Sequence, residues 1–481
     1  MKLKIVFFTI LLLTGLTLRA QQGEIWDLKS CIDYALENNI QVKQSDLNRI
    51  QNELALKGAK MSRLPTLNFS TNYNITTGRS INPFTNELVT NDVQSQRYNL
   101  SSGVTIFNYG SINNSIKRGV ADLEVSEYDL ENTKNQTTLS IITFFTNVLL
   151  NQEQMKNAQF TLETSKIRLD LVEKQRRLGV VNQQELLQAR QQVAVDELNL
   201  IRAENAFELA KLSLLQAMQI PLSSDFQVLT PEIPEPDVNA ILESPASIYQ
   251  TALAQQPDVK SAEAGERSAQ LGVKISEAGL YPTLSLSAGI ATNYSSIAPE
   301  TIAKEGSESI ITFEPIGTVE GTNTQVISRF PTISAAEEVD LTYGRQLDFN
   351  QNSFVGLNLN IPIFNGFSAR NNLQNARINQ QRAELNSLNT RNQLRQTIEQ
   401  AYMDAVAAGK SYFSSKKQVE ALSESFKNVE QRRALNAATL IEYNQTRNDL
   451  ERAKTDEIRN KYDYIFKLKI LDFYQGKNLS F

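Results

Sequence analysis

Residues 64–76 read LPTLNFSTNYNIT, and this stretch decides the fold class. Side chains of two kinds alternate along it: one face carries Leu67, Phe69, Thr71, Tyr73 and Ile75, and the other carries Asn68, Ser70, Asn72 and Asn74. A period of two is the pattern of a β-strand, in which successive side chains point to opposite faces. The stretch therefore predicts a strand with one mainly apolar face and one face of small polar residues.

The same alternation occurs in three further stretches, at 96–107, 283–294 and 353–364. A strand of about ten to twelve residues has the length of a transmembrane β-strand, whose apolar face meets lipid and whose polar face lines a wet lumen. A layer of a soluble β-sandwich alternates in the same way. The rest of the chain predicts no second sheet on which such a layer could pack, and this favours the membrane interpretation.

An internal duplication relates the two halves of the chain. Leu64 to Leu67 (LPTL) recurs as Tyr281 to Leu284 (YPTL), 217 residues later, and Ile106 to Asn108 (IFN) recurs as Ile363 to Asn365, 257 residues later. Two constant offsets that hold over several motifs in the same order indicate duplication. The difference between them predicts a 40-residue insertion between Pro282 and Phe364. The unusually long loop 295–351 lies in this interval, and the sequence suggests no role for it.

Long helical segments are predicted after each pair of strands, at about 110–217 and 366–474. Residues of one seam recur every seven positions, with mostly Ala between them: Leu186, Val193, Leu200, Phe207 and Leu214. Such a seam allows helices to pack closely side by side in a wall, although an ordinary coiled coil would show the same spacing. At 1.5 Å per residue, an unbroken helix from Gly110 to Leu178 would be about 100 Å long, far longer than a globular domain.

These patterns predict a domain organisation. Residues 1–20 form a signal peptide, with basic residues before a short apolar run and a cleavage site near Ala20. That run is too short to cross a bilayer as a helix. The first repeat covers 21–219, a Pro-rich linker covers 220–245, and the second repeat covers 246–476. Hairpin turns are predicted at 178–182 and 435–439, since Gly179 and Asn436 favour the left-handed conformation that ends a helix.

The composition argues against several classes of protein. The 48 basic and 53 acidic residues give a net charge of -5, so no basic field is present to attract nucleic acid. The chain has no His and a single Cys, Cys31, which excludes an internal disulfide and the commonest general base. We find no motif for a nucleophile, a phosphate or a metal. We therefore expect no enzyme, no catalytic residue, no cofactor and no metal site.

Taken together, the duplicated order of strand, strand and helical hairpin resembles the TolC-like outer-membrane efflux protein family over essentially all of the mature chain. Leu64-Pro65 and Tyr281-Pro282, which open the odd strands, and Ile363-Phe364-Asn365-Gly366, which closes the fourth, carry this resemblance. It implies a mixed, mainly α fold in which each protomer of a homotrimer gives four strands to one transmembrane β-barrel of twelve strands. A periplasmic α-helical barrel would continue that barrel.

The resemblance also implies functional positions at the hairpin tips. In the family, a Gly at the tip is followed by acidic residues that narrow the periplasmic entrance; here Asn436 stands at the Gly, Glu442 at the first acidic position and Gln445 at the second. Glu185 is the repeat partner of Glu442. An entrance gate is thus expected at Glu442, Gln445 and Glu185, with plain solvated helix-surface residues as the alternative. Contact with an adaptor is expected at the tip residues Leu178, Gly179, Val180, Val181, Leu435, Asn436, Ala437 and Ala438.

The function implied by this resemblance is passive conduction. An inner-membrane pump and a periplasmic adaptor (membrane fusion) protein would deliver substrates to an exit channel in the cell outer membrane, either in tripartite efflux or in type I secretion. The expected partners are a homotrimer, the adaptor, the pump and outer-membrane lipid, with no nucleic acid. Two alternatives are a structural or adhesive periplasmic coiled-coil protein, which has no need of amphipathic strands, and a substrate-specific porin, which would contain far less helix.

Overall fold

The computed structural model describes residues 25–81, 88–90, 92–221, 226–231, 243–298, 301–303, 308–322, 324–329, 332–335, 338–435 and 437–477. The predicted signal peptide 1–20, Asn436 of the second tip and most of the Pro-rich linker lie outside these residues. The chain divides into a helical unit (Met1–Ala55, Arg118–Gln270 and Ile378–Phe481) and a β unit (Leu56–Lys117 and Leu271–Arg377).

The long helices come in pairs of equal length. These pairs are α2 (Leu28–Asn38) with α6 (Pro245–Gln255), α3 (Ile40–Met61) with α7 (Pro257–Ala278), α4 (Ser111–Arg177) with α9 (Ser368–Ala434), and α5 (Gln183–Ala217) with α10 (Leu440–Tyr474). The first two pairs are separated by 217 residues and the last two by 257, which are the offsets found in the sequence motifs. Among the described residues, no helix combines the length and the apolar character that a membrane span requires.

The core of the helical unit repeats the same packing in each half. Cys31, Ile141 and Leu214 are fully buried in one cluster, where α2, α4 and α5 meet. In the second half, Ile248, Ile398 and Leu471 are buried in a cluster formed by α6, α9 and α10. Complete burial of one such aliphatic side chain contributes about 1.5–3 kcal/mol. Cys31 therefore fills a position that an isoleucine fills in the other half, and its burial raises the pKa of the thiol to about 12.

The turns that lead from a strand into a long helix also match. Two consecutive residues have positive φ at each turn: Tyr109 (50°) and Gly110 (76°) before α4, and Gly366 (62°) and Phe367 (64°) before α9. A glycine adopts this conformation at no steric cost, whereas a residue with a Cβ is strained by it. Each turn thus contains one glycine and one strained aromatic residue, in opposite order.

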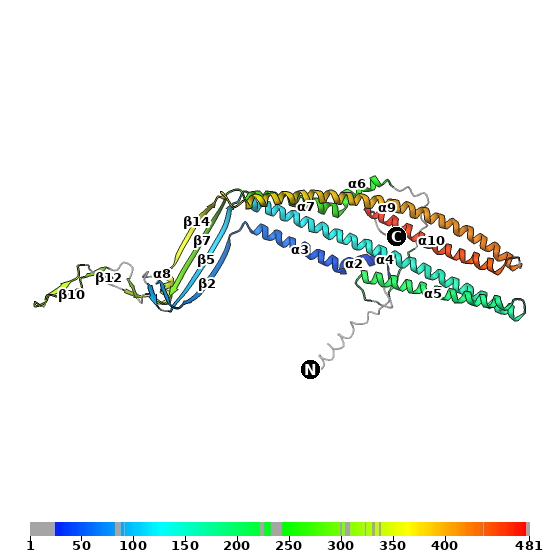
Figure 1. The fold of residues 1–481 in the computed structure, drawn as a ribbon, viewed down its shortest axis with the longest axis horizontal. Coiled ribbons are helices and arrows are strands. Elements are labelled where there is room, and N and C mark those ends of the chain that lie inside the picture. The colour runs from blue at the N-terminus through cyan, green and yellow to red at the C-terminus, as the bar shows by residue number, and fades with distance from the viewer. Residues whose placement is uncertain are drawn as a thin grey trace, which may run out of the picture. The chain divides into compact units, whose positions relative to one another are not determined.

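In the β unit, the largest sheet among the described residues has four antiparallel strands in the order β14-β7-β5-β2 (Figure 1). The strands are β2 (Thr66–Thr76), β5 (Val93–Phe107), β7 (Thr283–Ser295) and β14 (Asn352–Asn360). The register aligns Phe69 with Leu100, and Leu100 with Ile290, on one face. We call this face the apolar face; Asn, Ser and Gly dominate the other, which we call the polar face.

The predicted fourth strand, 353–364, is too long at its end. β14 stops at Asn360 because Pro362 has no backbone N–H to donate to a neighbouring strand. The second predicted strand, 96–107, begins three residues earlier, at Val93.

Short strands and one helix occupy the described parts of the region 295–351. Three antiparallel pairs lie one inside the next: β8 (Thr301–Ala303) with β13 (Glu338–Asp340), β9 (Ser309–Thr312) with β12 (Thr332–Ala335), and β10 (Pro315–Thr318) with β11 (Gln325–Ile327). The seven-residue helix α8 (Tyr343–Phe349) follows. Two other small pairs are β3 (Arg79–Ile81) with β4 (Leu88–Thr90), and β1 (Ile25–Trp26) with β6 (Gln227–Val228).

Candidate functional site at the hairpin tips

Both hairpin tips of the helical unit end their first helix in the same way. At the end of α4, Gly179 has φ of 77°, its N–H donates to the carbonyl of Arg176 at 3.1 Å, and the N–H of Val180 donates to the carbonyl of Gln175 at 2.9 Å. This pair of bonds is the Schellman motif, which satisfies carbonyls left free at a helix end. At the end of α9, the N–H of Ala437 donates to the carbonyl of Arg432 at 2.8 Å in the equivalent position.

The second helix of each hairpin begins with a capped turn that contains a candidate gate residue. The side chain of Asn182 accepts from the N–H of Glu185 at 2.9 Å, and the hydroxyl of Thr439 accepts from the N–H of Glu442 at 3.1 Å. Both glutamates are thus the third residue of a helix, where the positive end of the helix dipole stabilises a carboxylate. Glu185 and Glu442 therefore have a local structural role at equivalent positions of the two repeats.

Two adjacent arginines at the end of α9 pair with these glutamates. Arg432 lies 2.8 Å from the Oε1 of Glu442 within the same hairpin, and both side chains are largely exposed, by 53% and 39%. Arg433 lies 2.9 Å from the Oε1 of Glu185 in the other hairpin, where the exposed fractions are only 18% and 24%. Water screens the first pair more strongly than the second, so the Arg433–Glu185 bridge is the stronger of the two, and it is the pair that links the hairpins.

The remaining predicted tip residues differ in exposure. Leu178, Val180 and Leu435 are 79%, 70% and 79% exposed, which leaves large apolar side chains in contact with solvent at the end of each hairpin. Gln445 is exposed as well. Ala438 was predicted to contact a partner but is only 6% exposed, because the chain turns back and packs it in the cluster of Val429 and Tyr443.

A buried ion pair behind the tips is absent from the sequence-based site. Arg447 of α10 donates to Asp196 of α5 at 2.9 Å, with side-chain exposures of 10% and 5%. The guanidinium also donates to the carbonyl of Thr161 in α4 at 3.3 Å, and Gln192 donates to the second carboxylate oxygen of Asp196 at 2.9 Å. One charged group thus joins three helices. The available sequence signal was an Asp in a seam otherwise filled by Ala.

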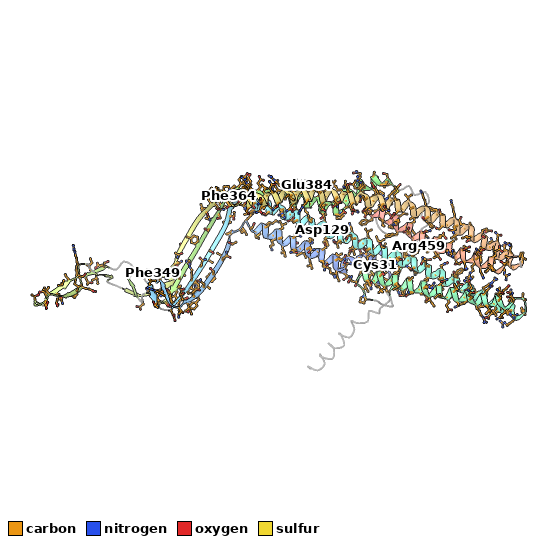
Figure 2. All side chains as sticks on the ribbon, in the orientation of Figure 1. Cys31, Asp129, Phe349, Phe364, Glu384 and Arg459 are labelled. Carbon is orange, nitrogen blue, oxygen red and sulfur yellow. The ribbon has the colours of Figure 1, made fainter. Side chains whose placement is uncertain are left out.

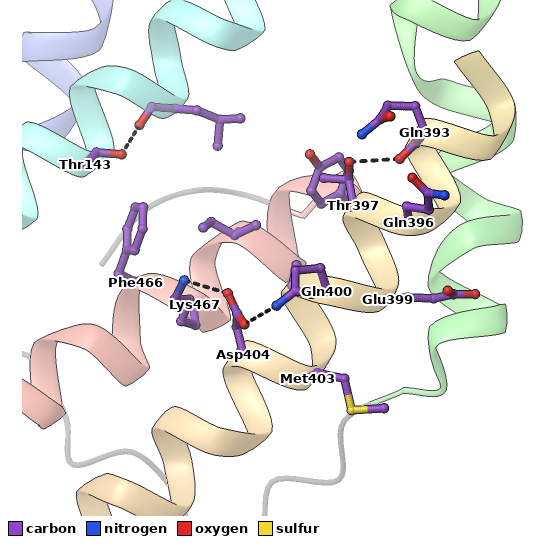
Figure 3. A pocket seen from close by; sticks show the side chains of 14 residues that line it. Thr143, Gln393, Gln396, Thr397, Glu399, Gln400, Met403, Asp404, Phe466 and Lys467 are labelled. Carbon is purple, nitrogen blue, oxygen red and sulfur yellow. Dashed lines mark hydrogen bonds and ion pairs between the residues drawn. The ribbon is translucent and has the colours of Figure 1, made fainter. Parts of the chain in front are cut away.

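Two cavities in the helical unit have charged side chains in their walls. One, of 440 Å³, lies next to the tips and includes Arg168, Glu185, Arg433 and Arg447 in its wall. The other, of 890 Å³, is lined by α4, α9 and α10 (Figure 3). There Asp404 accepts from Lys467 at 2.9 Å and from Gln400 at 2.7 Å.

The hydrogen bond from Lys467, followed by that from Gln400, lowers the pKa of Asp404. Across the described part of the chain, no cluster of three or more His, Cys, Asp and Glu could hold a metal ion. Both cavities thus contain paired charges, and the cavity next to the tips is lined mainly by polar side chains. That cavity suits water better than an apolar ligand.

Comparisons with known proteins agree with this architecture. The family described as "Outer membrane efflux protein" matches residues 31–218 and 329–476. The pyoverdine export outer membrane protein OpmQ of Pseudomonas putida is 26% identical over 205 residues, which are 42% of this chain and 42% of that protein. The match therefore spans less than half the length of this relative. OpmQ of Pseudomonas aeruginosa is 25% identical over 195 residues, 40% of each chain.

Solved structures resemble the fold over nearly its full length. The outer membrane protein VceC of Vibrio cholerae superposes with a TM-score of 0.71 at 14% identity, over 94% of this chain and 97% of that one. The CmeC outer membrane channel of Campylobacter jejuni gives 0.69 at 18% identity, over 96% and 88%. At such low identity these likenesses show the fold. Together with the family match over most of the sequence, they establish that the chain belongs to the outer membrane efflux protein family, the TolC-like channels of the cell outer membrane.

Proposed function

We propose that the protein is the passive exit channel of a tripartite efflux or type I secretion system. Three copies would contribute their strands to one twelve-stranded transmembrane β-barrel, and their helices to a tunnel that receives substrate from a periplasmic adaptor and an inner-membrane pump. No cofactor is needed in this role, because the pump supplies the energy upstream.

The four-stranded sheet is the observation that carries this proposal. Its two outer strands, β14 and β2, have no strand on their outer side among the described residues, and lipid cannot satisfy the free backbone groups of an open edge. β2 and β14 run in opposite directions, so β14 of one copy can pair with β2 of the next in an antiparallel ladder. Closure of such a ring places the apolar face toward lipid and the polar face toward the lumen.

Exposed apolar residues on the helices support assembly with further copies. A stripe on α5 consists of Leu187, Val195, Leu198, Ile201 and Leu209, each between 43% and 56% exposed. α9 carries a second stripe with Ile378, Leu385 and Leu388, which are 47%, 67% and 54% exposed. Burial recovers about 25 cal/mol for each Å² of apolar surface, so helices with such stripes gain stability from neighbouring helices. The adhesive coiled-coil alternative explains these stripes but does not explain the two-faced sheet.

We place the entrance of the tunnel at the tips. Glu442 and Gln445 from three copies would face the axis there, and Glu185 would stand beside them. The Arg433–Glu185 pair supports a closed resting arrangement, because it joins the two hairpins and must lengthen or rearrange if they move apart. The exposed Leu178, Val180 and Leu435 would provide apolar contacts for the adaptor.

Detergent-solubilised protein tests the proposed channel directly. Light scattering should give the mass of three chains, and insertion into a planar bilayer should produce discrete conductance steps. A monomer that stays in the soluble periplasmic fraction and conducts no ions would instead support the coiled-coil alternative.

The gate has its own test in the same bilayer recordings. Glu442→Gln leaves Arg432 without its carboxylate partner, so we expect reduced cation selectivity and weaker block by trivalent cations. Glu424→Gln is the matched control, since Glu424 belongs to the same hairpin and forms an exposed pair with Lys427 at 4.0 Å. Equal behaviour of the two variants would show that Glu442 is an ordinary surface residue.

A further inference from the structure

The short helix α8 lies on the apolar face of the sheet, at the edge where β2 and β7 end and β5 and β14 begin. The hydroxyl of Tyr343 in α8 donates to Gln96 and lies 2.8 Å from the hydroxyl of Tyr98, which are both residues of β5. The register places Tyr98 and Gln96 two and four residues along the strand from Leu100, and therefore on the same face. The ring of Tyr343 also packs against Tyr294 of β7, with centroids 4.8 Å apart.

Hydrogen bonds to the sheet fix the helix in this position. The hydroxyl of Thr292 donates to the carbonyl of Leu347 at 2.5 Å, and Thr292 is aligned with Tyr98 on the apolar face. Gln346 is 5% exposed, and its Oε1 accepts from the N–H of Ser295 at 3.0 Å. The buried side chain of α8, Gln346, is thus polar and hydrogen-bonded to the sheet, so the helix is held on the sheet's surface.

α8 coincides with the place where the apolar face changes character. Along β5 this face carries Phe107, which is aligned with Leu284 beyond a bulge, then Val104, Ser102 and Leu100, and then Tyr98 and Gln96. The distance from Phe107 to Tyr98 is about 30 Å along an extended strand, or about 23 Å along the membrane normal at a typical tilt. The apolar band of an outer-membrane protein is about 25 Å tall and ends in a girdle of aromatic residues. Tyr98, Tyr294 and Tyr343 stand where such a girdle belongs.

The outward side of α8 combines an exposed aromatic ring with charges. Phe349 is 64% exposed at the end of the helix (Figure 2), and Arg345 and Asp348 of the same helix are exposed as well. An apolar ring next to charged groups suits the boundary between acyl chains and headgroups, whereas charges are excluded from the hydrocarbon centre.

We propose that α8 is a lipid-binding element of the outer leaflet. Phe349 inserts at the boundary between acyl chains and headgroups, and the cluster of Tyr98, Tyr294 and Tyr343 sets the depth of the sheet in the membrane. The occupant is lipid because α8 continues the same face that closure of the strands turns outward. This inference rests on the proposed channel, since only a closed ring of strands presents that face to the bilayer.

Depth-dependent quenching of tryptophan fluorescence tests this. Trp26 is the single tryptophan, so Trp26→Phe removes all other tryptophan fluorescence. Phe349→Trp is introduced into this variant, and the full-length trimer is reconstituted in phosphatidylcholine vesicles. The probes are phosphatidylcholines brominated either near the headgroup or near the chain end. We expect lipid brominated near the headgroup to quench Phe349→Trp about twofold more strongly than lipid brominated near the chain end.

Two adjacent residues of β14 provide the controls. Leu357 is 67% exposed on the apolar face and aligned with Leu286, whereas Asn358 lies on the polar face. Leu357→Trp should be quenched by the deep bromines and Asn358→Trp by neither lipid. If Leu357→Trp behaves so but Phe349→Trp is unquenched, or is quenched best from the chain end, α8 is not an interfacial element. If Leu357→Trp is unquenched as well, the proposed channel itself fails.

Discussion

The buried pair of Asp196 and Arg447 provides a sharp test of how the hairpins are held together. Arg447→Met removes the guanidinium and leaves a carboxylate that is 5% exposed. Removal of one partner from a buried ion pair costs about 3–5 kcal/mol, because the remaining charge is desolvated without compensation. Gln192 still donates to Asp196 at 2.9 Å, so the lower end, about 3 kcal/mol, applies here.

Hydrogen exchange measured by mass spectrometry on the detergent-solubilised protein reports this loss of local stability for each segment of the chain. A free energy of opening that falls by about 3 kcal/mol raises the exchange rate about a hundredfold, since each 1.4 kcal/mol is a factor of ten. We expect the increase in peptides of α5 around Asp196 and of α10 around Arg447. The double variant Asp196→Leu with Arg447→Met removes both charges and should recover most of the protection.

The duplication supplies a matched control. Arg190 occupies the position of Arg447 in the first repeat, but its partner Glu173 is 3.0 Å away on the surface, with exposures of 57% and 39%. An exposed pair contributes only about 0–1 kcal/mol, so Arg190→Met should raise exchange less than tenfold. The reasoning is refuted if the two arginine variants exchange alike, or if the double variant is as labile as Arg447→Met.

Three further predictions concern other parts of the chain. Gly179→Val forces a β-branched residue into a φ of 77° and should abolish cross-linking to the adaptor while the three-chain mass is kept. Gly58→Val, in the open surface of α3, should leave both the cross-linking and the mass unchanged. Cys31 is fully buried, and burial raises its pKa to about 12, so maleimide should label it only after unfolding; labelling of the folded protein at pH 8 would contradict this. Asp404 has a lowered pKa, so its pair with Lys467 stabilises the fold above about pH 4 and loses this effect as the pH falls through the folded-state pKa. The melting temperature of Asp404→Asn should therefore be lower than that of the unchanged protein at pH 6, and the two melting temperatures should converge in acid. A difference that stays constant with pH would show that the ionised carboxylate is not the source of the stabilisation.

The sequence by itself determined the local features of this protein. The alternation in 64–76 sets the two faces of β2, because successive residues of any strand point to opposite sides. The positions of Gly179 and Asn182 mark the turn between α4 and α5, because a left-handed residue and a capping side chain act on neighbouring backbone groups. The family resemblance depended on this order of elements, and the family match confirms it.

Only the tertiary structure decided which distant side chains meet. Glu442 appeared as a free gate carboxylate, yet Arg432 holds it; Glu185 pairs with Arg433, which is 248 residues away. Asp196 and Arg447 are 251 residues apart, and the position of α8 on the apolar face depends on Tyr98, 245 residues from Tyr343. Periodicity fixes the face on which a residue lies but not the rotation and stagger of two packed elements, and these set the distance between their charged groups.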